Sequence, residues 1–355
     1  MNKTLRNSVV AIAAAGVVGA AGASAASAAT LNMSGATFPQ IAYKDFCANG
    51  GDCNYTGVGS GTGIRNLING VNTLIGSDAV LTPEQQGQLG AAPVYVPTLL
   101  GAISVPVNVS GVTGNRLKLT GTQVGDIFAG KITNWKQLRT GINAKQPLPN
   151  AAITVCVRAD ASGTSFGFSR YLGKVSKGFL TSVGGGGSQT PPWTAPVVVK
   201  APGNPGVANC VKTTANSIGY VDLADALRAG LGSNVAGIGA SRVIKVGKKT
   251  KRVTQYVLPS PKTISAAGDI PSSKIKKDLT IDFSASPVQG SYPIVITTFL
   301  VASSNSKNKG QVPDAQRVAN FFLAKAQQAK LTGYGFAPLP SPVIAAAKKN
   351  IANIK

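Results

Sequence analysis

The amino-acid sequence predicts an α/β protein whose mature chain folds into two lobes. Apolar segments rich in β-branched residues recur along the chain, and Gly-rich turns and helical stretches separate them. This alternation is typical of an α/β fold. The chain has 355 residues, whereas single hydrophobic cores stop growing at about 250–300 residues. We therefore expect two cores rather than one.

The expected strands are the apolar segments at residues 54–58, 94–97, 102–109, 153–157, 218–221 and 294–301. Helices are predicted between them at residues 63–69, 124–128, 165–172, 207–213 and 223–229. The clearest helical pattern covers residues 314–330, where an apolar stripe follows Pro313. A last helix is expected over residues 342–351.

Residues 1–28 have the composition of a cleavable secretory signal. Lys3 and Arg6 precede an apolar run, and Ala-x-Ala cleavage sites follow it at residues 23–25 and 26–28. An anchoring helix is the weaker alternative, because the run falls short of the roughly 20 apolar residues that span a membrane. No cysteine stands at the cleavage site to carry a lipid. We expect a soluble, monomeric mature protein that is periplasmic or secreted.

The charge balance favours an anionic partner. The chain has 35 Lys and Arg residues against 12 Asp and Glu residues, and a positive potential of this size concentrates anions near the protein. Nucleic acid is not expected, because aromatic residues are few and are not interleaved with the basic ones. A solvated basic surface without a partner is the alternative.

Residues 243–278 differ in character from the rest, since Lys and Arg are spread there among Pro, Ser and Gly. We interpret this stretch as a basic insertion, a solvated excursion from one lobe. A partner surface is the alternative interpretation.

The four cysteines of an exported chain would meet an oxidising compartment. Cys47 and Cys53 flank a Gly-Gly-Asp turn, whereas Cys156 and Cys210 are far apart. Of the three possible connectivities we prefer the local pair, Cys47 with Cys53, which leaves Cys156 with Cys210. A metal site is not expected from these residues.

The absence of histidine restricts catalysis. It excludes a Ser-His triad, a histidine general base and a His-ligated zinc ion. A hydrolase built on carboxylates and serine remains conceivable, but no motif points to one. We therefore expect a protein that is not an enzyme and that carries no cofactor.

Three Gly/Ser/Thr-rich segments each precede a predicted helix, at residues 34–39, 57–63 and 160–165. Backbone N–H groups at helix starts are unpaired and favour anions. The alternative for each segment is a simple cap or turn. Nucleotide binding is disfavoured, because the middle segment lacks the lysine of a phosphate-binding loop and its glycines do not match the dinucleotide spacing.

Two charged residues suggest selectivity for an oxyanion. Arg158 ends an apolar strand two residues before Asp160, so its guanidinium could grip two oxygens while Asp160 holds its other face. Asp78 follows a buried segment, and a carboxylate tolerates a bound anion only if that anion carries a proton to donate. Phosphate near neutral pH carries one and sulfate does not, so Asp78 would reject sulfate. An ordinary surface pair and a turn cap are the alternatives.

Taken together, the segments resemble the phosphate-binding proteins of the bacterial ABC phosphate transporter. The resemblance covers nearly the whole mature chain except residues 243–278. It is carried by SGATFPQIAYKDFC from Ser34, YTGVGSGTGIRNLINGV from Tyr55, GSDAVLTPEQ from Gly76, LTGTQVGDIFAGKITNWKQL from Leu119, ITVCVRADASGTSFGFSRYL from Ile153, GNPGVANCVKTTANSIGYVDLADAL from Gly203 and FAPLPSPVIAAAKKNI from Phe336.

The resemblance implies a two-lobed type II periplasmic binding protein fold with a double-crossing hinge. One lobe would comprise residues 29–106 and 295–355, and the other residues 107–294. The crossings are expected near Pro106 and near residues 291–296. Ligand binding would close the lobes by a hinge motion.

The resemblance also implies a ligand shell, position by position. The matching residues are Thr37, Phe38, Ser60, Asp78, Arg158, Ser162, Gly163 and Thr164. Phe38 and Gly163 would act through the backbone, and Asp160 would brace the arginine. Ala161 departs from the glycine usual in the family.

The function implied is capture of inorganic phosphate and delivery to an ABC transporter. The alternatives are a secreted scavenger of phosphate, arsenate or another oxyanion, a phosphatase-like enzyme and a basic envelope adhesin.

Overall fold

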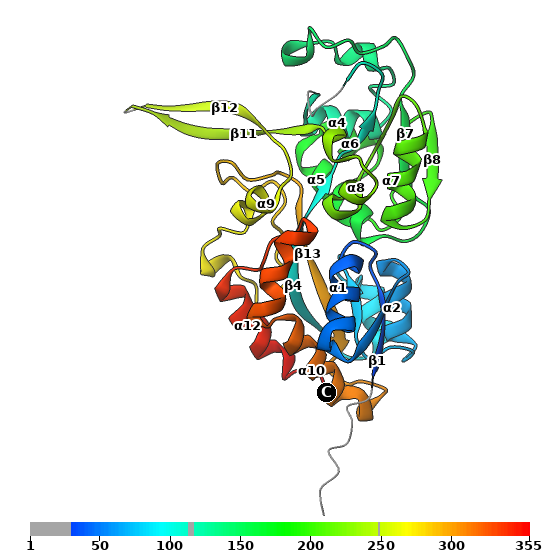
Figure 1. Cartoon of the computed structure of the whole chain (residues 1–355), viewed down its shortest axis with the longest axis vertical. Coiled ribbons are helices and arrows are strands. Elements are labelled where there is room, and N and C mark those ends of the chain that lie inside the picture. Colours follow the sequence, from blue (N-terminus) through cyan, green and yellow to red (C-terminus); the bar gives the residue numbers. More distant parts are fainter. Residues whose placement is uncertain (1–29, 113–116, 248) are drawn as a thin grey trace, which may run out of the picture.

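The computed structural model describes residues 30–112, 117–247 and 249–355. They form two α/β lobes stacked along the long axis of the molecule (Figure 1). The α/β fold class expected from the sequence is confirmed. The expected signal at residues 1–28 lies outside the described residues.

The lower lobe in Figure 1 is built on a six-stranded sheet with the order β10-β4-β13-β3-β1-β2. Its strands are β1 (Leu31–Gly35), β2 (Cys53–Gly57), β3 (Ile75–Ser77), β4 (Pro93–Ser104), β10 (Val221–Asp222) and β13 (Val295–Ser303). Strand β1 is parallel to β2 and β3, whereas β13 is antiparallel to β3 and β4. All residues of β13 are buried, as expected of a central strand covered on both faces.

Helices cover this sheet: α1 (Gln40–Phe46), α2 (Ser60–Ile68), α3 (Pro83–Leu89), α10 (Val312–Phe322), α11 (Lys325–Lys330) and α12 (Ser341–Ile351). The helix predicted over residues 314–330 is interrupted, because Ala324 has an extended backbone (φ −67°, ψ 146°) between α10 and α11.

The upper lobe contains a four-stranded sheet with the order β5-β9-β7-β8. Its strands are β5 (Val107–Asn108), β7 (Thr154–Arg158), β8 (Val198–Ala201) and β9 (Ser217–Gly219). The helices of this part are α4 (Gly121–Phe128), α5 (Gly163–Val175), α6 (Lys177–Ser182), α7 (Gly203–Thr213) and α8 (Leu223–Arg228). Aromatic rings fill the core, and Phe168 stacks on Tyr220 at a centroid distance of 4.5 Å.

Two predicted strands are each divided between sheets. Residues 102–109 belong to β4 and β5, and the strand is interrupted at Pro106, which has no N–H to donate to a ladder. Residues 218–221 are likewise divided between β9 and β10. In both cases the chain passes from one lobe's sheet to the other's, which an apolar pattern does not reveal.

A third sheet joins β6 (Lys118–Thr120) to the hairpin of β11 (Gly237–Val246) and β12 (Lys249–Val257). The hairpin projects from the body of the molecule (Figure 1). The outer part of the hairpin belongs to the basic stretch at residues 243–278, and its residues 249–252 are exposed. Helix α9 (Pro261–Ala267) of the same stretch buries Ile264 and Ala267 in the core.

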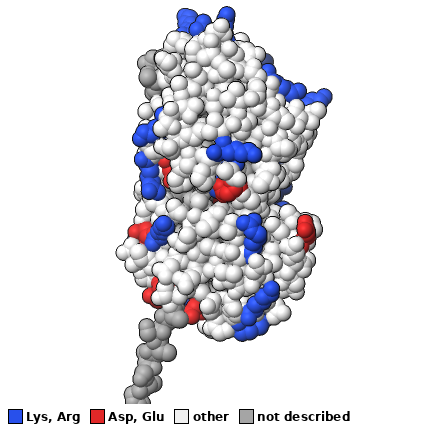
Figure 2. All heavy atoms as spheres, turned by 90° about the vertical axis from the view of Figure 1, so that its right-hand side faces the viewer, with Lys and Arg blue, Asp and Glu red and all other residues white. Residues whose placement is uncertain are grey.

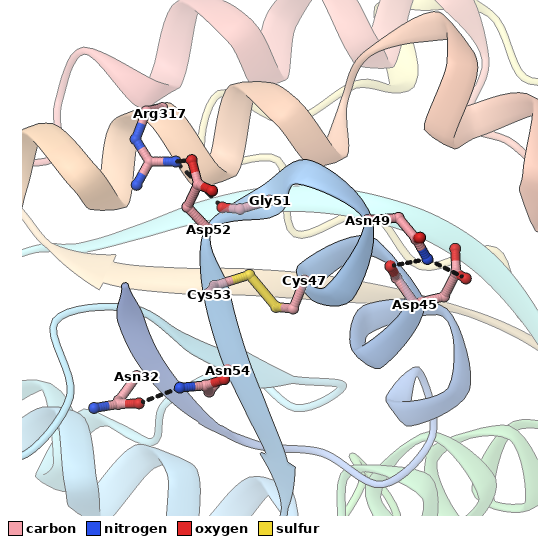
Figure 3. The surroundings of a disulfide bond; sticks show 9 residues. All are labelled: Asn32, Asp45, Cys47, Asn49, Gly51, Asp52, Cys53, Asn54 and Arg317. Carbon is pink, nitrogen blue, oxygen red and sulfur yellow. Dashed lines mark hydrogen bonds and ion pairs between the residues drawn. A yellow bond between two sulfur atoms is a disulfide. The ribbon is translucent and has the colours of Figure 1, made fainter. Parts of the chain in front are cut away.

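The structure contains the cysteine connectivity preferred from the sequence. Cys47 bonds to Cys53, which ties the turn after α1 to the start of β2, and Arg317 of α10 donates to the neighbouring Asp52 at 2.9 Å (Figure 3). Cys156 bonds to Cys210 and ties β7 to α7.

Basic side chains are scattered over both lobes on the face in Figure 2, and acidic ones are few. Within residues 30–112, 117–247 and 249–355, every helix is too short or too polar to cross a membrane.

Candidate anion site between the lobes

Helix starts from both lobes converge on the cleft. Helix α5 begins at Gly163, and the Ser162 side chain caps it by accepting from the Ser165 N–H at 3.1 Å. The N–H groups of Gly163 and Thr164 precede the first intrahelical hydrogen bonds. Helix α2 begins at Ser60 in the opposite lobe. Both helix dipoles place partial positive charge at the site.

The two lobes are in contact, so the structure is a closed form. The Gly61 N–H donates to the Ala161 carbonyl at 3.0 Å, and the Asn204 N–H donates to Thr37 Oγ1 at 3.1 Å. A Cβ atom on Gly163 would lie 2.4 Å from Ser60 Oγ and 2.7 Å from the Cβ of Asp78. Only glycine allows this close approach.

Arg158 is fixed at the end of β7 with 6% of its surface exposed. Its Nε donates to Asp160 Oδ1 at 2.9 Å, and its Nη2 donates to Asp160 Oδ2 at 2.5 Å. Its Nη1 donates to Asn204 Oδ1 at 3.1 Å. Burial alone would raise the pKa of Asp160, but the hydrogen bonds from Arg158 and the Gly203 N–H lower it. Asp160 therefore stays ionised and braces the guanidinium.

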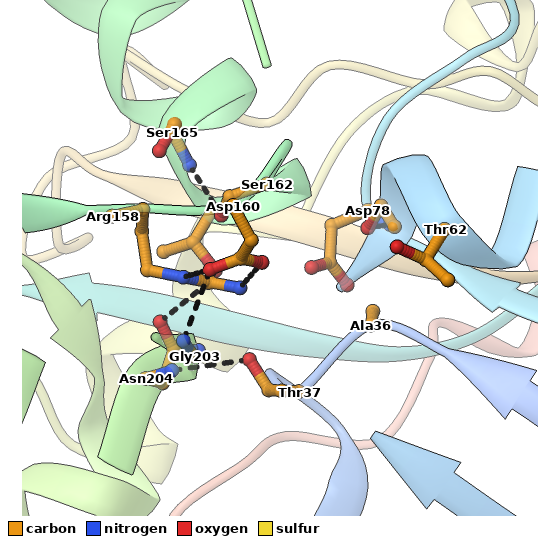
Figure 4. A network of polar contacts seen from close by, with 12 residues as sticks. Ala36, Thr37, Thr62, Asp78, Arg158, Asp160, Ser162, Ser165, Gly203 and Asn204 are labelled. Carbon is orange, nitrogen blue, oxygen red and sulfur yellow. Dashed lines mark hydrogen bonds and ion pairs between the residues drawn. The ribbon is translucent and has the colours of Figure 1, made fainter. Parts of the chain in front are cut away.

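Asp78 follows β3 in the other lobe and is 3% exposed. Its Oδ1 accepts from Thr298 Oγ1 at 2.7 Å, and its N–H donates to Ser60 Oγ at 3.2 Å. Burial raises the pKa of Asp78 to about 7, although Thr298 and Arg158 partly oppose the rise. Figure 4 shows the Asp78 carboxylate and the Arg158 guanidinium pointing toward each other across the cleft.

The structure brings the residues identified in the sequence to one place. Thr37 contacts the start of α7, and Thr164 Oγ1 accepts from Arg158 Nη1 at 3.4 Å. The Phe38 ring packs in the core against Phe336, so only its backbone is free to face a ligand. The site offers many donors and a single carboxylate acceptor, which suits an anion that carries a proton. No cluster of metal-ligating side chains occurs among the described residues.

Sequence reasoning did not single out Asn204 or Thr298. Asn204 is fully buried, and its Nδ2 lacks a hydrogen-bond partner in the described part of the chain. The sequence feature that could have identified Asn204 is a fourth glycine at a helix start. Gly203 directly precedes Asn204 at the beginning of α7 and has a positive φ of 63°. Thr298 lies within buried strand β13, where an apolar pattern gives no sign of a polar role.

Two α/β lobes that close on a site built from strand ends and helix starts define a binding protein of the periplasmic type. Residues 20–326 match the PBP superfamily domain. The phosphate-binding protein PstS of Haemophilus influenzae is 30% identical over 90% of this chain and 91% of its own length. This protein therefore belongs to the PstS family of phosphate-binding proteins.

Two solved structures share the fold. A high-affinity periplasmic phosphate-binding protein, PfluDING, bound with phosphate is 23% identical, with a TM-score of 0.68 over 90% of this chain and 93% of that one. A proposed phosphate ABC transporter substrate-binding protein with bound phosphate, from Clostridium perfringens, is 17% identical, with a TM-score of 0.56 over 87% and 99%.

Proposed function

We propose that this protein is a non-catalytic, exported binding protein that captures inorganic phosphate between its lobes and delivers it to an ABC transporter. Membership of the PstS family supports the proposal. The lobes would comprise residues 29–106 with 295–355, and residues 107–294, except that β10 (Val221–Asp222) pairs with β4 in the sheet of the first lobe. The observation that carries the ligand assignment is the opposition of Asp78 and Arg158 in a closed, buried site.

Phosphate would be held by donors from both lobes. We assign the hydroxyls of Thr37, Ser60, Ser162 and Thr164, the N–H groups of Phe38 and Gly163, and the Arg158 guanidinium to its oxygens. Thr298 binds the Oδ1 of Asp78, and we assign the Oδ2 to the ligand. It would accept the proton that hydrogen phosphate carries. Sulfate has no such proton and would meet an unpaired carboxylate.

Calorimetry tests the ligand assignment. At pH 8.5, where Asp78 is mainly ionised, wild-type protein should bind phosphate tightly and sulfate at least about hundredfold more weakly. Arg158→Ala should lose at least about hundredfold in phosphate affinity, because it removes two charge-assisted hydrogen bonds. The control is Arg228→Ala on the surface of α8, which should bind as wild type. Equal affinities for sulfate and phosphate would contradict the assignment.

Delivery to a transporter requires a test in cells. Deleting the gene should slow uptake of radioactive phosphate at low external phosphate, and a plasmid copy should restore it. A plasmid copy with Arg158→Ala should not. If the protein accumulated in the medium and its loss left uptake unchanged, it would be a secreted scavenger rather than a transporter component.

A further inference from the structure

A second cavity, of about 460 Å³, lies away from the interlobe site. Its walls are the base of the β11–β12 hairpin, the start of α4, the later part of α5 and the loop that leads into β13. Its lining includes Gly121, Thr122, Tyr171, Val175, Ala240 and Arg242. Its volume lies in the range of small-molecule pockets.

Arg242 is a buried cation in this wall. It is 4% exposed, and its Nη2 donates to the carbonyl and the hydroxyl of Ser291, both at 3.2 Å. Its Nε is buried without a hydrogen-bond partner among the described residues. These contacts are all to neutral groups.

No carboxylate of the described chain pairs with Arg242. The acidic residue on the neighbouring loop is Asp282, and it is engaged by two cations of α5, Arg170 at 3.3 Å and Lys174 at 2.5 Å. Burying a guanidinium without a counter-charge is energetically unfavourable. A bound anion would supply the missing charge.

Helix α4 adds donors to the same cavity. It begins at Gly121, and the Thr120 side chain caps it by accepting from the Gln123 N–H at 3.1 Å. Gly121 and Thr122 both line the cavity, and their N–H groups precede the first intrahelical hydrogen bond of α4. The dipole of α4 and the buried guanidinium of Arg242 therefore both favour a negatively charged ligand in this cavity.

Part of the remaining wall is apolar and would suit the carbon body of a ligand. Tyr171, Val175 and Ala240 contribute apolar surface. We propose that this cavity binds a small organic anion, whose carboxylate or phosphate group is held by Arg242 and the start of α4. The site shares no residue with the proposed phosphate shell and is independent of that function.

Three probes that share a phenyl ring test the proposal, and the neutral one has the shape of benzoate. Benzoate, phenyl phosphate and the neutral benzamide would be titrated against wild-type protein that holds one equivalent of inorganic phosphate, which keeps the interlobe site filled. Ligand-observed NMR would report binding. At least one of the two anions should bind about tenfold or more tightly than benzamide, and whichever binds better identifies the acid group.

Matched variants locate the binding. Arg242→Gln should weaken the anion about tenfold or more, because it removes a charged donor. Lys251→Gln removes the same charge from an exposed position of the same hairpin and should bind as wild type. Ala240→Leu keeps the guanidinium but fills the cavity, and should abolish binding even if Arg242→Gln fails to fold.

Two results would overturn the proposal. One is that neither anion binds more tightly than benzamide. The other is that Arg242→Gln and Ala240→Leu, both folded by circular dichroism, bind as well as Lys251→Gln.

Discussion

Thr298 donates a 2.7 Å hydrogen bond to the carboxylate of Asp78, across 220 positions of sequence. The bond joins central strand β13 to the residue after β3, and it orients the carboxylate so that the other oxygen is left for a ligand. Because both residues are buried, the bond also stabilises the ionised form of Asp78 against the cost of burial.

Discrimination against sulfate should depend on pH. With a pKa of about 7, Asp78 is mainly a neutral acid at pH 5 and a carboxylate at pH 8.5. The acid can donate to a sulfate oxygen, whereas the carboxylate repels sulfate. Sulfate affinity should therefore fall roughly 30-fold from pH 5 to pH 8.5, in proportion to the acid fraction. Competition calorimetry at the two pH values measures this change in sulfate affinity. Asp78→Asn should bind sulfate equally at both pH values, and a pH-independent wild type would contradict the mechanism.

Removing the hydroxyl of Thr298 should raise the pKa of Asp78 further. Thr298→Val has a similar shape but cannot donate, and a hydrogen bond to a charged group contributes about 1.5–3 kcal/mol. The midpoint of the sulfate pH dependence should move upward by about one to two pH units. Thr297→Val, at the preceding position of β13, is the control and should leave the midpoint in place.

Asn204 should matter for phosphate affinity through Arg158. Asn204→Ala removes the acceptor at 3.1 Å from Arg158 Nη1, so the guanidinium loses one of the groups that orient it. We expect phosphate affinity to fall about fivefold to twentyfold. Asn209→Ala, on the exposed side of the same helix, is the matched control. Unchanged affinity in Asn204→Ala would show that Asp160 and Thr164 suffice to orient Arg158.

Closure should be prevented by a single methyl group at residue 163. The Cβ of Gly163→Ala would lie 2.4 Å from Ser60 Oγ in the opposite lobe. Phosphate affinity should fall at least about tenfold, and small-angle scattering with phosphate should show a larger radius of gyration than for wild type. Gly87→Ala in α3 has nothing within 4 Å of the new atom, so it should keep affinity and gain up to about 1 kcal/mol of stability. A compact, tightly binding Gly163→Ala protein would show that the lobes close differently.

The two disulfides should contribute unequally to stability. Cys156 and Cys210 are separated by 54 positions, and Cys47 and Cys53 by 6. Chain-entropy arguments then give about 4 kcal/mol for the long loop and about 2 kcal/mol for the short one. Urea unfolding of the two double Cys→Ser variants would measure the difference. A larger loss for the short loop would mean that Cys47 and Cys53 stabilise the protein through native contacts around Asp52 rather than through chain entropy.

Much of the local structure could be predicted from the sequence. Apolar runs located β7 and β13, and glycine and hydroxyl residues marked the starts of α2 and α5, because strand burial and helix capping depend on neighbouring residues. The lack of histidine and the position of Asp78 relative to its strand were likewise visible without a fold.

Tertiary structure decided which of these features meet. Arg158 becomes a fixed cation only where Asp160 and Asn204 surround it, and Asp78 acquires a pKa of about 7 only because folding buries it. In the sequence, Thr298 and Arg242 are ordinary strand residues. Long-range packing places Thr298 against the carboxylate of Asp78, and it places Arg242 beside a cavity where no carboxylate of the described residues is paired with it. Capping and periodicity are local and can be read along the chain, whereas desolvation and charge pairing depend on contacts between distant segments.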